Sequence, residues 1–456
     1  MNDRMPVLAP SVVLAIAWAL TSSISIAFAQ TPPREKPKLK NFGSSLKRLK
    51  WDTNANASVE TKRRDAKPAG GDEIDVVRVE TSLVVCDVLI INERGQSVQG
   101  LTEKDFVLAE DGKPQEVGMF SSGDDAKVPR SIVLLIDYSG SQLPFINTSI
   151  AAAKTLVDKL GPLDTMAIVT DDVELLQDFT RDKGKLKDDL ESLRRLSTFS
   201  WDRDSGWQRH FGKSKQYSAL MATLREAFDR EDLRPIIIFQ TDGDEAPYLQ
   251  NLVIVPGIPP NLRLDLKKEA EQGAKRMKKA QQSRQCEFSL TDIYRAAEKS
   301  RATIYTVVPG IRLLGLSPDE QVKQMIADVE LRMRSTSAIF NRRALEQSRK
   351  REEDSLKRTP PEALKYWADE AYKVQSALAA VATSSGGWTS FLEDPAQADE
   401  IYSRIFSDIN RRYIVGFYPT NKDRDGKRRA VKIEVRGHPE YIVIGRKSYY
   451  APEPDQ

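Results

Sequence analysis

The feature that most constrains the fold is a set of continuous apolar runs separated by segments with helical spacing. The runs lie at 131–136, 166–169, 236–239 and 303–308. An uninterrupted Ile/Val/Leu run is typical of a parallel strand, because helices cover both of its faces. Between the runs, apolar residues with helical spacing occupy 150–160, 183–196, 217–229 and 289–300. Strands that alternate with helices predict an α/β fold with a doubly wound, mostly parallel sheet, a Rossmann-like arrangement.

A second pattern, before and after this region, predicts a flanking antiparallel β domain. Residues 74–120 contain short apolar segments, with Asp111-Gly112 placed as a hairpin turn. Near the end of the chain, the alternating segments 431–435 and 441–444 predict a hairpin that joins this unit. The apolar segment 413–418 is expected to be the last strand of the central sheet.

A helical insertion interrupts the α/β pattern. Ser317-Pro318-Asp319-Glu320 has the sequence of a capping box with proline at the first helical position. Apolar residues follow at helical spacing, and a second helix is expected from 359 onward. Its apolar face is interpreted as core packing rather than as a cofactor site. The predicted domains are a signal peptide at 1–29, a disordered basic linker at 30–72, a β unit at 73–127, an α/β domain at 128–420 with the insertion at about 317–362, and a C-terminal hairpin at 421–452.

The first residues have the layout of an export signal. Arg4 precedes the apolar stretch 7–29, which ends in Ala27-Phe28-Ala29. We expect cleavage after Ala29 and a secreted, periplasmic or cell-envelope protein, with retention as a membrane anchor as the alternative. The linker that follows is rich in proline and in basic residues, so we expect a solvated tether that can touch an anionic envelope surface weakly.

Composition excludes several classes of site. The chain has 69 Lys and Arg against 66 Asp and Glu, a net charge of +3, so no global field favours nucleic acid. Two cysteines, Cys86 and Cys286, exclude a disulfide scaffold and a cysteine-ligated metal cluster, and we expect them to be unpaired. With only His210 and His438 present, any metal would have to be bound by oxygen.

Polar side chains follow two of the apolar runs. Asp137, Ser139 and Ser141 come directly after the first run with the spacing D-x-S-x-S, and Asp242 follows the third run. Ligands of doubly wound sheets bind at the carboxyl ends of the strands, so we expect these side chains to lie close together. Ser218, at the start of a predicted helix, adds a third hydroxyl. Such oxygen ligands suit a hard cation, for which we expect Mg²⁺.

This order of residues resembles the metal-ion-dependent adhesion site of von Willebrand factor type A (VWFA) domains. The flanking segments 98–106, 413–421 and 449–452 resemble the VWFA-related proteins that are common in acidobacteria. The resemblance covers about 74–452, apart from the insertion. It implies the VWFA fold and an adhesion-type binding site.

The resemblance also implies a role for each site residue. Ser139, Ser141 and Ser218 would bind the cation directly, and Asp137 and Asp242 would hold it largely through water. The cation would be Mg²⁺, or else Mn²⁺ or Ca²⁺. One coordination position would stay open for an acidic group of a partner. Neutral hydroxyls leave most of the positive charge on the ion, which agrees with such a role.

The chain departs from the family pattern at one ligand. The middle-loop residue is usually threonine, whereas here it is assigned to Ser218, with Ser214 and Thr223 as alternatives nearby. Asp244, also close to the expected site, is interpreted as a solvated loop residue.

The function predicted from these features is a metal-dependent binding module for a protein with an exposed Asp or Glu. An enzyme is not expected, because hydrolysis needs a general base and no histidine is placed for that role. The sequence also lacks G-x-x-x-x-G-K-[ST] and H-E-x-x-H. The alternatives are an envelope scaffold in which a metal only stabilises loops and, third, a metal-dependent hydrolase.

Overall fold

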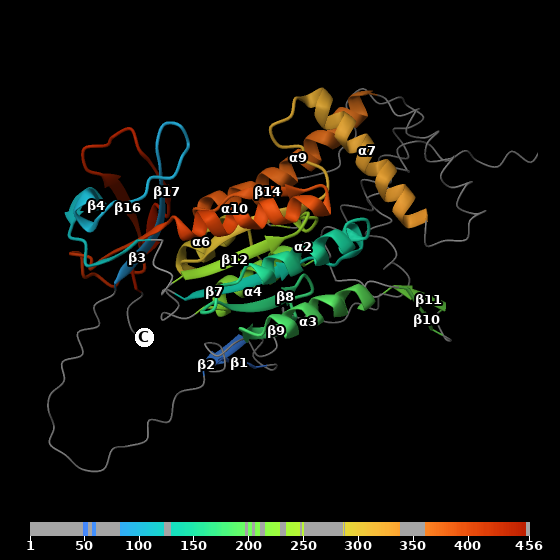
Figure 1. Ribbon diagram of the computed structural model, residues 1–456, viewed down its shortest axis with the longest axis horizontal. Helices are drawn as coiled ribbons and strands as arrows, with labels where there is room; N and C mark the ends of the chain where they lie inside the picture. Colours follow the sequence, from blue (N-terminus) through green and yellow to red (C-terminus); the bar gives the residue numbers. More distant parts are fainter. Residues whose placement is uncertain are drawn as a thin grey trace, which may run out of the picture.

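The computed structural model describes residues 49–52, 57–60, 83–122, 129–196, 199–202, 206–209, 215–228, 234–246, 249, 286, 288–337 and 361–452. Figure 1 shows an α/β domain with a β-sandwich at one end and a pair of helices that extends from it. The predicted signal peptide lies outside the described residues. Among the described residues, no helix combines the length and apolarity that a membrane crossing requires.

The α/β domain is built on a six-stranded sheet with the strand order β14-β13-β12-β7-β8-β9. All neighbouring strands are parallel except β9, which runs antiparallel to β8. The four predicted runs are confirmed as the four inner strands, and the two edge strands are additions. The strands are β7 (Arg130–Ile136), β8 (Thr165–Thr170), β9 (Leu175–Thr180), β12 (Arg234–Gln240), β13 (Thr303–Pro309) and β14 (Thr389–Leu392).

Helices cover both faces of this sheet, as the continuous apolar runs predict. Along β7, Val133 and Leu135 belong to one buried cluster, whereas Ile132 and Leu134 belong to the other. Successive side chains of a strand point to opposite faces, so a strand between two helix layers must be apolar at every position. One layer contains α4 (Gln216–Glu226), α6 (Leu290–Ser300) and α9 (Pro361–Ser384), and the other contains α2 (Ile146–Asp158), α3 (Lys183–Leu196) and α10 (Ala398–Asn410).

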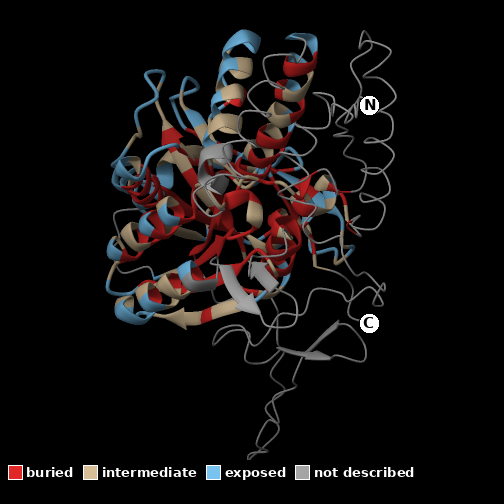
Figure 2. Ribbon diagram, turned by 90° about the vertical axis from the view of Figure 1, so that its right-hand side faces the viewer, coloured by how far each residue is buried: buried red, intermediate tan, exposed pale blue. Residues whose placement is uncertain are grey.

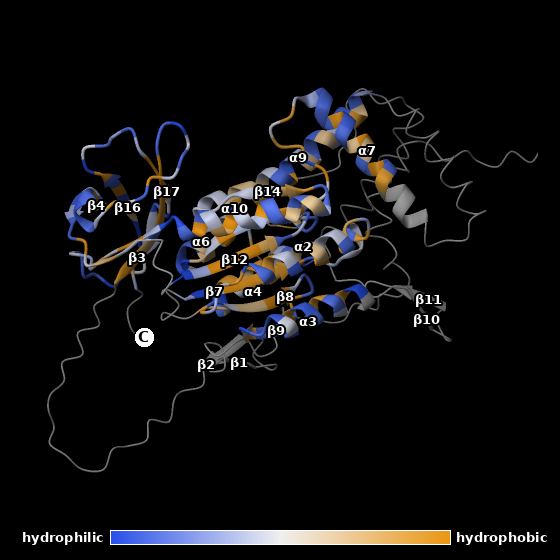
Figure 3. Ribbon diagram, in the orientation of Figure 1, coloured by the Kyte–Doolittle hydropathy of each residue, from blue (hydrophilic) through white to orange (hydrophobic). Residues whose placement is uncertain are grey.

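The coloured ribbons show the result of this layering. Buried residues gather in the strands and on the inner faces of the helices (Figure 2). The inner strands β7 and β12 are strongly hydrophobic, whereas the sandwich carries hydrophilic loops (Figure 3).

The β-sandwich consists of two four-stranded sheets with the orders β17-β3-β15-β6 and β18-β16-β4-β5. Its strands come from both sides of the α/β domain in the sequence, as expected. The predicted hairpin is confirmed between β4 and β5, where Asp111 (φ 47°) and Gly112 (φ 81°) form the turn. The strands are β3 (Val84–Ile91), β4 (Phe106–Glu110), β5 (Lys113–Gln115), β6 (Met119–Ser121), β15 (Tyr413–Phe417), β16 (Arg428–Val435), β17 (Ile442–Gly445) and β18 (Ser448–Tyr450).

Two predictions about these strands are wrong. β15 is not the last strand of the central sheet, because it pairs antiparallel with β3 and β6 and its side chains pack in the sandwich core. β16 and β17 do not form a hairpin with each other, because β16 pairs with β4 in one sheet and β17 pairs with β3 in the other. An apolar pattern predicts that a strand is buried but does not specify the sheet that it joins.

Two further segments refine the predicted organisation. α7 (Pro318–Ser337) packs against α9 through a small cluster that includes Met325, Leu364 and Ala368. The C-terminal half of α9 continues into the core of the α/β domain.

Within the predicted disordered linker, β1 (Leu49–Asp52) and β2 (Ala57–Glu60) form an antiparallel pair, which corrects that prediction for these residues.

Candidate functional site

Asp137 occupies the centre of the candidate site, directly after β7. Its backbone N–H donates to Gln240 O at 3.0 Å, which keeps it beside the end of β12. Its side chain is 1% exposed. Oδ1 accepts from the backbone N–H of Ser139 at 2.9 Å, and Oδ2 accepts from Thr241 Oγ1 at 2.9 Å and from Gln216 Nε2 at 3.0 Å. Groups from three separate segments therefore fix the orientation of this carboxylate.

The two serines of D-x-S-x-S lie next to each other. Ser139 Oγ and Ser141 Oγ are 2.9 Å apart, and both side chains are buried. Ser141 lies in a short 3-10 helix, η2 (Gly140–Gln142), that follows β7 and brings the second hydroxyl back toward the first. The spacing thus places two hydroxyl oxygens and one carboxylate in one loop.

The loop after β12 supplies two further carboxylates. Asp242 is half-buried, and its Oδ1 accepts from the backbone N–H of Asp244 at 3.3 Å. Asp244 Oδ1 accepts from Gln216 Nε2 at 2.6 Å. The sequence suggested that Asp244 is a solvated loop residue. The structure differs, because Asp244 shares the hydrogen-bond donor Gln216 Nε2 with Asp137.

Ser218 makes a different contact from the one expected. Its hydroxyl donates to Glu245 Oε1 at 2.8 Å, and its backbone N–H donates to Glu245 Oε2 at 3.0 Å. Because α4 begins at Gln216, Ser218 lies in its first turn, where Glu245 accepts from the free backbone N–H groups. The alternative residue Ser214 lies outside the described part of the chain. The role of Ser218 as a ligand stays a prediction.

The structure thus brings together Asp137, Ser139, Ser141 and Asp242. Three residues of this network carry no motif and were missed: Gln216, Thr241 and Glu245. Thr241 could have been found, because it directly precedes Asp242 at the end of a buried strand. Gln216 and Glu245 gave no signal, since their roles depend on contacts between segments that are far apart in the sequence.

Burial and neighbouring carboxylates raise the pKa of Asp137 and of Asp244. Burial, followed by the charge of Asp242, raises the pKa of Asp137 to about 7. Burial and the charges of Asp242 and Asp137 raise the pKa of Asp244 well above its usual value. Negative charges gathered in a buried site disfavour the ionised forms, and a bound cation would reverse this effect.

We expect this charge to make the metal-free protein less stable as the pH rises. The pKa of Asp137 is about 7 in the folded protein, against a usual value of 3.8. Between these two pH values the folded state binds more protons than the unfolded state, so the free energy of unfolding falls as pH rises and levels off above pH 7. Thermal unfolding in EDTA at pH 5 and pH 8 measures this change. The change in thermal stability between the two pH values should be smaller in Asp137→Asn than in the wild type. An equal change in both proteins would contradict the assignment of the raised pKa to Asp137.

α9 packs closely against the loop that follows β12. Gly243 has a φ of +77°, and a Cβ atom at this position would lie 2.9 Å from Leu378 Cδ1. We expect Gly243→Ala to lower the free energy of unfolding by about 2–3 kcal/mol through both strain and overpacking. The matched control is Gly437→Ala, which has a φ of +76° but no atom within 4 Å of the added Cβ. The control should cost about 1 kcal/mol, and equal costs would exclude a role for Leu378.

The donor set fits a hard cation. Hydroxyl and carboxylate oxygens are the ligands that Mg²⁺ prefers. No group of three or more His, Cys, Asp and Glu side chains within the described ranges is placed to hold a metal. A cation here would therefore depend on the serine hydroxyls. Both cysteines are free, as expected, and both are buried. Cys286 Sγ donates to Glu245 Oε1 at 3.3 Å.

Comparisons with known proteins give matches to solved structures alone. No family model matches the chain, and no curated protein matches it. Similar solved structures include a von Willebrand factor type A protein from Catenulispora acidiphila (10% identity, 81% of this chain and 74% of that one, TM-score 0.28). They also include the vWF domain of the type V pili tip protein Mfa5 from Porphyromonas gingivalis (13%, 62% and 95%, 0.28) and BatB from Bacteroides thetaiotaomicron (17%, 40% and 67%, 0.24). Because these TM-scores are below 0.5, the α/β fold class depends on the strand order and helix layers described above.

Proposed function

We propose that this protein is a secreted or envelope-associated binding module that engages an acidic group of a protein partner through a divalent cation. The observation that carries the proposal is the meeting of two acidic loops at the carboxyl edge of the sheet. One is the loop after β7, with Asp137, and the other is the loop after β12, with Asp242 and Asp244. Asp137 is buried there beside two hydroxyls and within the electrostatic influence of Asp242. Uncompensated carboxylates in a buried site favour a cation.

The hydroxyls determine what such a cation could do. Ser139 and Ser141 are neutral, so they would leave the ion with positive charge that an incoming carboxylate can neutralise. Asp137 and Asp242 would hold the ion largely through water. In this proposal the ion is Mg²⁺, with Mn²⁺ or Ca²⁺ as substitutes, and the partner provides an exposed Asp or Glu.

A scaffold with a stabilising metal and a metal-dependent hydrolase are the competing functions. Hydrolysis would need a general base near the ion. His438, the histidine within the described ranges, belongs to the sandwich, where its Nδ1 lies 2.9 Å from Glu440 Oε1. We therefore favour a binding module over an enzyme. The proposed location follows from the predicted cleavage after Ala29.

Affinity capture from an envelope extract tests the function. The mature chain is used as bait in Mg²⁺ and again in EDTA, and Asp137→Ala is the control bait. The proposal expects a partner that is retained only by the wild type in Mg²⁺ and is lost when one of its acidic residues is changed to the amide. Retention in EDTA, or retention that survives every such change, would contradict it. A rise in thermal stability with Mg²⁺ and no such partner would favour the scaffold.

A further inference from the structure

Gln216 lies between the two acidic loops of the site. Its side chain is fully buried at the first residue of α4. The amide nitrogen donates to Asp137 Oδ2 at 3.0 Å and to Asp244 Oδ1 at 2.6 Å, and the amide oxygen accepts from the backbone N–H of Glu245 at 3.0 Å. Because the N–H of Glu245 requires an acceptor, the orientation of the amide is determined, and its nitrogen faces the two carboxylates.

Asp244 is a carboxylate that the proposed cation site does not use. It follows Asp242 by two residues, and its backbone N–H donates to Asp242 Oδ1. The charges of Asp242 and Asp137 both act on it. If the Asp244 side chain turned toward a cation held by Asp137 and Asp242, it would become a ligand, since carboxylate oxygens are preferred ligands. The hydrogen bond from Gln216 to Asp244 Oδ1 instead fixes the direction of this side chain, and a bond to a charged acceptor is stronger than a neutral one.

We propose that Gln216 is a positioning residue that keeps the Asp244 carboxylate off the cation and so preserves the coordination position for the acid of the partner. This inference rests on the proposed function. If Asp244 became a ligand, it would neutralise part of the charge of the ion and take the place of a water or of the partner. The cation would then bind more tightly while its use as a bridge would be lost.

Gln216→Met tests the inference with Mn²⁺ as the probe. Methionine has a similar length and no donor, so it frees Asp244 without opening a large cavity. Asp137 also loses the bond from Gln216 but keeps those from Ser139 and Thr241. We expect calorimetry to give a roughly tenfold gain in Mn²⁺ affinity, the scale of a lost hydrogen bond to a charged group. We also expect the water-proton relaxation enhancement per bound Mn²⁺ to fall, because a carboxylate oxygen replaces a bound water. The second variant, Gln216→Met with Asp244→Asn, should restore the wild-type enhancement.

The outcomes separate this inference from the proposed function. Weaker Mn²⁺ binding by Gln216→Met with unchanged relaxation per bound ion would assign Gln216 a purely structural role and overturn the inference alone. Absence of Mn²⁺ binding by the wild type would overturn both. If Gln216→Met does not fold, the Asp244→Asn variant alone tests whether Asp244 is kept off the ion. Its relaxation enhancement should equal that of the wild type, and a higher value would show that Asp244 already binds the ion.

Discussion

Asp137→Ala should abolish measurable Mg²⁺ and Mn²⁺ binding while the central sheet stays folded. The carboxylate is oriented by three hydrogen bonds and is placed between the serine loop and the loop after β12. Loss of a residue that holds a metal through water costs about 10–100-fold in affinity, and we expect the upper end because this carboxylate connects both loops. Asp137 follows β7 and contributes no apolar packing, so its removal should leave the sheet intact. Calorimetry measures the binding, and circular dichroism measures the fold.

The control for this prediction is another aspartate on the same domain. Asp158 ends α2, and its side chain is 60% exposed in an ion pair with Lys187. Asp158→Ala removes the same charge from the protein but leaves the site untouched, so it should bind metal as the wild type does. Equal metal affinity for Asp137→Ala and Asp158→Ala would show that the ion binds elsewhere.

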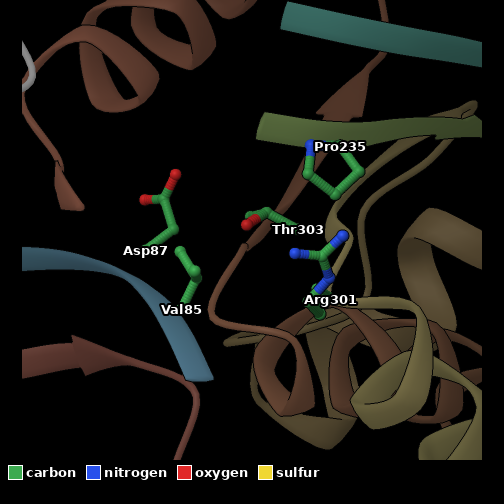
Figure 4. Close-up of a pocket in the computed structure, with 5 residues that line it drawn as sticks. All are labelled: Val85, Asp87, Pro235, Arg301 and Thr303. Atoms are coloured by element: carbon green, nitrogen blue, oxygen red, sulfur yellow. The ribbon is translucent and has the colours of Figure 1, made fainter. Parts of the chain in front are cut away.

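We also expect a large loss of stability on substitution of Arg412, which lies where the sandwich meets the α/β domain. Its side chain is 1% exposed. The guanidinium donates to Gly386 O, forms an ion pair with Asp408 (3.4 Å) on α10, and donates to Asp87 O (3.4 Å) on β3. Asp87 also accepts from Arg234 Nε at 3.3 Å. Asp87 also lines a small pocket, together with Val85, Pro235, Arg301 and Thr303 (Figure 4).

We expect Arg412→Met to lower the free energy of unfolding by about 3–5 kcal/mol, because it leaves the buried Asp408 carboxylate without its ion pair. Urea denaturation measures the change. Arg411 provides the matched control, since it is exposed and donates to Ser97 Oγ at 3.2 Å. Arg411→Met should change the stability by no more than about 0.5 kcal/mol. A loss at Arg412 no larger than that at Arg411 would mean that this ion network does not stabilise the junction.

The inner strands of the α/β domain were predictable because the physical constraint on them is strong. A strand between two helix layers must be apolar on both faces, and β7 and β12 show this directly in the sequence. The edge strands escaped prediction for the same reason. β9 is only partly buried at most positions, and β14 has four residues with Thr389 and Ser390 at its start. Neither carries a continuous apolar run.

The candidate site was predictable to the extent that its residues follow those strands. Asp137 and Asp242 were found because each comes directly after a buried run, and parallel strands bring their carboxyl ends to one edge. The contacts of Ser218 and Gln216 were not predictable, since they depend on where α4 begins and on which of its first residues face Glu245. The sheet that each β strand of the sandwich joins was likewise fixed by tertiary pairing rather than by local pattern.

A calorimetric titration of Mn²⁺ into the purified mature wild-type protein is the direct test of the cation site. We expect saturable binding of one ion at the edge formed by Asp137, Ser139, Ser141 and Asp242. Absence of any saturable binding would contradict the account. The two acidic loops would then be part of an α/β scaffold without a bound cation.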